Sequence, residues 1–110
     1  MISLHLTTMI ESSVSKPLHK FLSDLTGEER FGVALHLATK DLVRLKLKEA
    51  EEIIQYFEHR YKMDFKKFKK AWEKGEIPQK HSFQVEKDYW EWEAATSDRE
   101  RLRQMIEKLP

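Results

Sequence analysis

Side chains capable of metal or nucleophilic chemistry are present in this sequence but scattered along it. The histidines form no His-x-x-x-His pair and no Glu-x-x-His motif, the spacings that hold zinc or di-iron on helices. They are His5, His19, His36, His59 and His81. The absence of cysteine excludes a thiolate zinc site, a cysteine nucleophile and a disulfide scaffold. The sequence therefore predicts no metal ion and no cofactor.

Acid–base catalysis has equally little support. His59, between Glu58 and Arg60, is the one candidate proton carrier, and an exposed histidine near a helix end is the alternative interpretation. Three glutamates crowd residues 49–52, where carboxylates on a solvated helix mainly favour solubility. The sequence contains no Gly-rich phosphate loop, nucleophile elbow or P-loop. We therefore expect a protein that is not an enzyme.

The densest aromatic cluster is Tyr89-Trp90-Glu91-Trp92. On a helix, at about 100° per residue, Tyr89 and Trp92 lie about 60° apart, whereas Trp90 lies about 160° from Trp92. One packing surface cannot hide both tryptophans. Either the helix lies between two layers of its own fold, or another protein chain covers one face, since Trp and Tyr are frequent anchors of such contacts.

Carboxylates surround this aromatic cluster. They would complement the field of a partner with a basic, nucleic-acid-handling groove. The candidate partner-binding residues are Trp72, Glu86, Asp88, Tyr89, Trp90, Glu91, Trp92 and Glu93.

Residues 62–74 are basic on one side and apolar on the other. Phe65, Phe68 and Trp72 recur at helical spacing and form the apolar side. The basic side consists of Lys62, Lys66, Lys67, Lys69, Lys70 and Lys74. Two interpretations stay open: an amphipathic helix with a solvated lysine face, or a patch that binds phosphates or an acidic partner.

The first residues alternate between apolar and polar side chains over residues 2–7, which predicts a short half-buried strand that pairs with a second chain. A strand followed by two helices suggests a ribbon-helix-helix DNA binder, in which Ser3, His5 and Thr7 would contact nucleic acid in the major groove. No Lys or Arg precedes Lys16, which weakens this alternative.

Composition favours helices throughout. The 110 residues include only three Gly and three Pro, too few for the turns of a many-stranded fold. With 40% hydrophobic and 35% charged residues and a net charge of +1, most elements must be amphipathic. The predicted fold class is all-α, an elongated helical hairpin or coiled-coil-like assembly with one short N-terminal strand.

The expected helices follow from capping signals. A short helix begins near Pro17, and a capping box at Thr26-Gly27-Glu28-Glu29 starts a long helix that ends near Tyr61. Along that helix an apolar four-three spacing runs through Phe31, Leu35, Ala38, Leu42 and Leu45. Its members Leu35, Leu42 and Leu45 are the predicted interface between identical chains, and hence indicate a homo-oligomer.

Two further caps and a division of the chain complete this organisation. Asp64 caps a short helix that ends at Gly75, and Ser82 caps the last helix, with a second capping box near Thr96 that predicts a break. Residues 1–25 form an N-terminal segment for dimerisation or DNA binding, and residues 26–110 form a helical partner-binding region.

The chain has neither a long apolar run nor the basic, apolar start of a signal peptide, which predicts a cytoplasmic protein without membrane contact. It lacks Asn and Cys and is rich in Lys and Glu, as thermophile proteins tend to be.

The order of features from Glu49 onward resembles small helical antitoxin-like proteins of prokaryotic toxin–antitoxin pairs, often uncharacterised and archaeal or thermophilic. The residues that carry the resemblance are Tyr61-Lys62-Met63-Asp64-Phe65, then Trp72 and Gly75-Glu76-Ile77-Pro78, then Val85 to Ala94. The resemblance implies a non-catalytic protein that binds and silences a cognate toxin, commonly one that attacks RNA, and that assists repression of its own operator.

Overall fold

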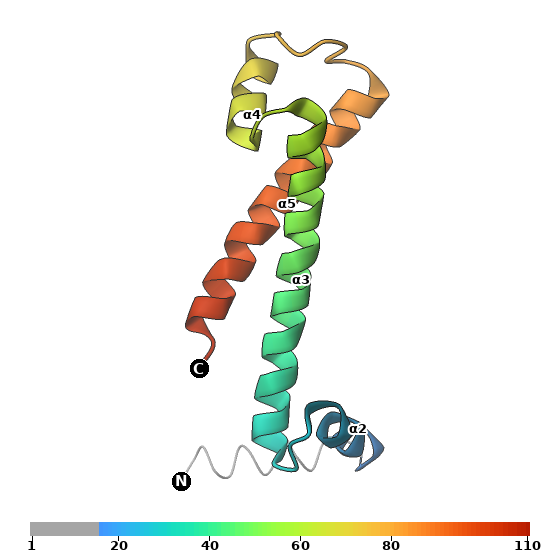
Figure 1. Cartoon of the computed structure of the whole chain (residues 1–110), viewed down its shortest axis with the longest axis vertical. Coiled ribbons are helices and arrows are strands. Elements are labelled where there is room, and N and C mark those ends of the chain that lie inside the picture. The colour runs from blue at the N-terminus through green and yellow to red at the C-terminus, as the bar shows by residue number, and fades with distance from the viewer. Residues whose placement is uncertain (1–15) are drawn as a thin grey trace. The chain divides into compact units, whose positions relative to one another are not determined.

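The computed structural model describes residues 16–110, and all regular elements in that range are α-helices (Figure 1). They are α2 (Lys16–Thr26), α3 (Phe31–Tyr61), α4 (Phe65–Glu73) and α5 (Phe83–Lys108). The predicted all-α class is confirmed for these residues. The predicted strand and the candidate nucleic-acid contacts Ser3, His5 and Thr7 lie outside the described residues.

The chain divides into two compact units. The N-terminal unit, Met1–Leu42, contains α2 and the first part of α3, and the C-terminal unit, Val43–Pro110, contains the rest of α3 with α4 and α5.

The long helix starts later than its sequence predicts. Gly27 has a φ of 72°, the left-handed conformation that ends helices and that glycine adopts without strain. Thr26 therefore belongs to α2, and its hydroxyl donates to the carbonyl of Leu22 at 2.7 Å. The Glu28 carboxylate then accepts from the N–H of Arg30 at 3.1 Å. The predicted start at Thr26 is wrong because this glycine separates the two helices, and α3 begins at Phe31.

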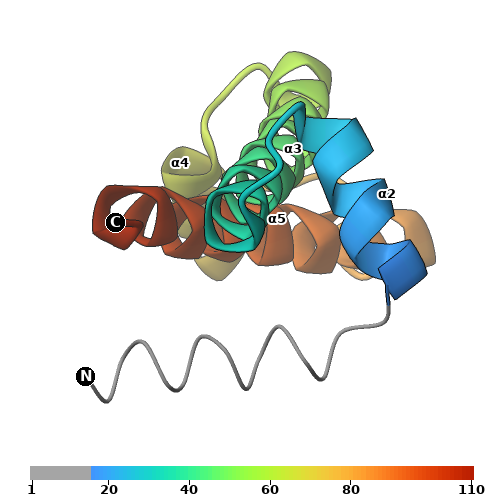
Figure 2. The same ribbon diagram turned by 90° about the horizontal axis from the view of Figure 1, so that it is seen from below.

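In the described part of the N-terminal unit, residues 16–42, few apolar side chains are buried. Phe31 and Ala34 are buried, and the ring of His19 contacts that of Phe31 edge-on at 5.3 Å. Figure 2 shows α2, in blue, joined to the start of α3 by a short turn. Phe21 and Leu25 of α2 are 73% and 80% exposed, so the described residues leave these two apolar side chains uncovered.

The predicted caps of the last two helices are confirmed. Asp64 accepts from the N–H of Lys67 at 2.8 Å, and Ser82 accepts from the N–H of Val85 at 3.2 Å. Gly75, with a φ of 73°, follows α4. The helix α5 continues without interruption through Thr96, where the sequence predicted a break, and the Thr96 hydroxyl donates to the carbonyl of Trp92 at 2.8 Å.

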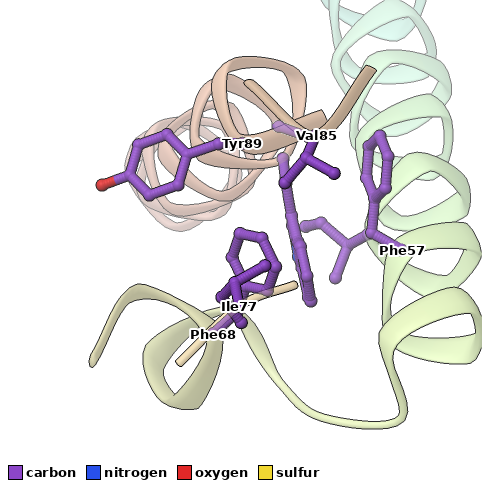
Figure 3. Close-up of a cluster of buried hydrophobic side chains, with 8 residues drawn as sticks. Phe57, Phe68, Ile77, Val85 and Tyr89 are labelled. Atoms are coloured by element: carbon purple, nitrogen blue, oxygen red, sulfur yellow. The ribbon is translucent and has the colours of Figure 1, made fainter. Parts of the chain in front are cut away.

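An aromatic core holds the three helices of the C-terminal unit together. Figure 3 shows members of this cluster, with Phe57 on α3, Phe68 on α4 and Tyr89 on α5. The indole of Trp92 is fully buried there and stacks on Phe57 and Tyr61, with ring centroids 5.6 and 5.7 Å apart. The aromatic core consists of Ile54, Phe57, Phe68, Ile77, Val85, Tyr89, Trp92 and Ala95.

The difference in burial between Trp92 and Trp90 predicts a large effect on stability for one substitution and a small effect for the other. Trp92→Ala empties the centre of the aromatic core and is expected to lower the free energy of unfolding by about 3–5 kcal/mol. Trp90→Ala removes a side chain that is 64% exposed and is expected to change it by about 0.5 kcal/mol or less. Chemical denaturation followed by circular dichroism measures both, and equal losses would contradict the assignment.

Candidate partner-binding surface

The outward face of α5 carries two large aromatic side chains. Phe83 and Trp90 are 80% and 64% exposed, and their spacing of seven residues places them on the same side of the helix. Trp90 contacts Tyr89 edge-on, with ring centroids 5.5 Å apart, so its indole leans on a buried neighbour. We call Phe83 and Trp90 the outer aromatic face.

The sequence-predicted partner-binding residues fall into two groups. Asp88, Tyr89 and Trp92 are buried, and Trp72 is half-buried against Tyr89 at 4.8 Å between ring centroids. These four side chains therefore build the fold. The group that remains open to solvent consists of Trp90 and Glu91, which are exposed, and Glu86 and Glu93, which are half-buried.

A groove of about 490 Å³ lies between α3 and α5. Its apolar floor includes Ile53 and Tyr56, which are 44% and 58% exposed. Its charged lining is entirely acidic, with Glu49 and Glu52 on α3 and Glu91 on α5. We call this the acidic groove.

Sequence reasoning assigned Glu91 to the partner-binding residues but left Glu49 and Glu52 as solvated carboxylates. The signal for their position was the three-four spacing of Glu49, Glu52 and Tyr56, which places them on one stripe of α3. That this stripe borders α5 depends on tertiary packing. Two of the groove's carboxylates form exposed ion pairs, Glu49 with Lys46 at 3.5 Å and Glu91 with Lys87 at 3.6 Å, which contribute little to stability.

A polar cluster ties the end of α3 to the start of α5. Asp88 is only 2% exposed, and its Oδ2 accepts from the Tyr61 hydroxyl at 2.5 Å and lies 3.3 Å from Nε of Arg60. Its Oδ1 accepts from the Gln84 amide at 2.8 Å. A buried carboxylate is tolerated when it is paired and hydrogen-bonded in this way. Asp88 is therefore a structural residue and is not free to meet a partner.

Burial and the hydrogen bond to the Asp88 carboxylate raise the pKa of Tyr61 from 10.0 to about 12. Burial also raises the pKa of Tyr89, and the nearby carboxylates of Glu93 and Glu73 add to this effect. Both phenols are thus held in their protonated form by the fold.

Three further points that the sequence raised concern a metal site, a membrane span and His59. Within residues 16–110 no three acidic or histidine side chains gather as they would around a metal ion. None of the described helices combines the length and the apolar character that crossing a membrane requires. His59, the candidate proton carrier, is exposed on α3.

The sequence profile of the Uncharacterized protein MJ0235 family matches residues 33–110, and the chain belongs to this family. The matched range includes the whole C-terminal unit, with its aromatic core, the outer aromatic face and the acidic groove. No curated protein and no solved structure matches the chain.

The raised pKa of Tyr61 predicts a loss of stability in alkali. Below pH 10 the phenol is protonated in both states, whereas between about pH 10 and 12 only the folded chain keeps the proton, so the free energy of unfolding falls as the pH rises. Tyr61→Phe is expected to make this fall shallower. Denaturant titrations at several pH values measure the slope, and identical slopes for the two chains would contradict the prediction.

Proposed function

We propose that this member of the family is a non-catalytic, antitoxin-like protein that binds and neutralises a cognate toxin, one that attacks RNA. The observation that carries the proposal is the exposure of Trp90, 64%, on a helix whose other tryptophan is fully buried. A second exposed aromatic ring, Phe83, lies on the same side of the helix, and large exposed apolar side chains of this kind are typical of interaction sites. Trp is also the residue type most enriched among interface residues that dominate binding energy.

The charges near this surface support a basic partner. Glu86 and Glu93 lie half-buried on α5, and Glu91 is exposed at the edge of the acidic groove. A toxin that handles RNA needs a positively charged surface, because it must contact phosphates. Carboxylates arranged around an aromatic anchor would complement that surface and speed its association.

The acidic groove extends the same character onto α3. It offers an apolar floor, Ile53 and Tyr56, between the carboxylates of Glu49, Glu52 and Glu91. A basic side chain with an aliphatic stem, such as Lys or Arg, suits such a groove, because its stem packs on the floor while its charge meets the rim. We assign the outer aromatic face the role of anchor and the acidic groove the role of electrostatic complement.

The first test uses the protein encoded by the adjacent reading frame as the partner. Co-expression of this chain is expected to relieve growth arrest caused by that protein, and Trp90→Ala is expected to abolish the relief. In titration calorimetry Trp90→Ala should weaken binding by about 30-fold or more, because truncating an interface Trp typically removes at least about 2 kcal/mol. The matched control is Met105→Ala, which truncates another exposed apolar side chain of α5, 42% exposed.

The controls decide what a negative result means. Circular dichroism must show that Trp90→Ala keeps the helicity and the unfolding midpoint of the original chain. If the folded variant relieves growth arrest as well as the original, the anchoring role of Trp90 is wrong. If the original chain neither binds the adjacent protein nor relieves its toxicity, the antitoxin proposal itself is wrong.

Self-association is a second proposal, carried by the exposure of three leucines of α3. Leu35, Leu42 and Leu45 are 42%, 55% and 51% exposed, although their spacing is that of a helix-helix seam. We propose that a second copy of the chain covers them.

Sedimentation equilibrium tests this interface. Leu42→Glu would place a charge in the seam and is expected to yield monomers, whereas Arg44→Glu, at an exposed position about 160° from Leu42 around the helix, should leave the oligomer intact. A monomeric original chain at micromolar concentration, or an oligomer unchanged by Leu42→Glu, would contradict the proposal.

A further inference from the structure

A second charged surface, with the opposite sign, lies on α4 and the residues that flank it. Its six lysines are all exposed, and within residues 16–110 none of them forms an ion pair or a side-chain hydrogen bond. We call Lys62, Lys66, Lys67, Lys69, Lys70 and Lys74 the lysine face.

The spacing of the lysines within the lysine face destabilises α4, the helix that carries most of them. Lys66 has Lys69 and Lys70 three and four residues away, where like charges repel by a few tenths of a kcal/mol per pair. Elsewhere the chain places opposite charges at this spacing, as in Lys87 with Glu91 and Arg101 with Asp98. The short helix is stabilised instead by its Asp64 cap and by burial of Phe68.

A pocket of about 430 Å³ extends the lysine face toward α5. Lys66 and Lys69 line it together with Thr96 and Arg99 of α5. Arg99 is half-buried and, within the described residues, has no carboxylate partner. A guanidinium in this position matches the geometry of a phosphate group.

Two carboxylates, Glu58 and Asp64, also line the pocket. Asp64 is already engaged, because it accepts from the N–H of Lys67 at 2.8 Å as the cap of α4. Three cationic side chains, Lys66, Lys69 and Arg99, therefore outnumber the two carboxylates by one, which leaves the pocket net positive.

We propose that the lysine face, together with the Arg99 pocket, binds the phosphate backbone of a nucleic acid. The aromatic side chains of α4 turn to the core: Phe68 is buried, and Phe65 and Trp72 are half-buried. The surface therefore offers neither the exposed anchors of a protein interface nor rings on which bases stack. The lysines and Arg99 contact phosphates and leave the bases unread, so the binding is independent of sequence and strongly dependent on salt.

The test measures the affinity of the full chain for a fluorescent single-stranded RNA and for a blunt DNA duplex over a range of salt concentrations. Both probes carry the same phosphate chemistry, and the tighter of the two identifies the form that is preferred. Lys66→Gln/Lys69→Gln/Arg99→Gln is expected to weaken binding about tenfold or more and to reduce the slope of log K against log salt by about 2–3.

A control with the same change in net charge separates this site from general electrostatic attraction. Arg44→Gln/Lys48→Gln/Lys108→Gln removes three exposed cations outside the lysine face and should leave affinity and slope nearly unchanged. A second variant, Lys67→Gln/Lys70→Gln/Lys74→Gln, changes only exposed positions and keeps the inference testable if the pocket variant unfolds.

Three outcomes would overturn the proposal. One is absence of binding to both nucleic acids at about 50 mM salt, where contacts to phosphates are strong. Another is an equal loss in the control variant. The third is binding to a polyglutamate peptide in preference to both nucleic acids, which would identify the surface as a site for an acidic protein.

Discussion

The packing of one indole organises the part of the molecule that carries the proposed function. Trp92 stacks on Phe57 and Tyr61, both at an interplanar angle of 21°, and is fully buried. Its indole N–H has no hydrogen-bond acceptor within the described residues. Ring packing, not hydrogen bonding, therefore holds Trp92 in place, and this fixes the rotation of α5. With Trp92 inward, helical geometry turns Trp90 outward.

The charged side chains of the C-terminal unit gather on two separate surfaces. Carboxylates gather at the acidic groove, and lysines at α4, so a net charge of +1 conceals two surfaces of opposite sign. Asp88 of α5 contributes to neither surface, because its carboxylate is buried and binds Tyr61, Gln84 and Arg60 inside the fold. The proposed binding of a toxin and the proposed binding of a nucleic acid thus rest on different side chains, and either proposal can fail without the other.

The features that the sequence predicted correctly are those that depend on residues close to one another in the chain. The caps at Asp64 and Ser82 and the all-helical class are local properties, and they were right. The start of α3 was wrong because Gly27 ends α2 after Thr26. Helical periodicity also predicted that Trp90 and Trp92 face apart. Which of them is buried, and that Glu49 meets Glu91 across a groove, depend on contacts between helices distant in sequence, which no local pattern specifies.

The central claim is that the fold buries Trp92, one of the two indoles of α5, and leaves the other, Trp90, exposed for a partner. Fluorine NMR of the full chain labelled with 5-fluorotryptophan tests it directly, with each resonance assigned by a Trp→Phe variant. In the chain alone, the Trp90 resonance should shift when H₂O is replaced by D₂O, while the Trp92 resonance should not. Addition of the protein from the adjacent reading frame should suppress the shift of Trp90. A Trp90 resonance as insensitive to solvent as that of Trp92 in the chain alone would contradict the account.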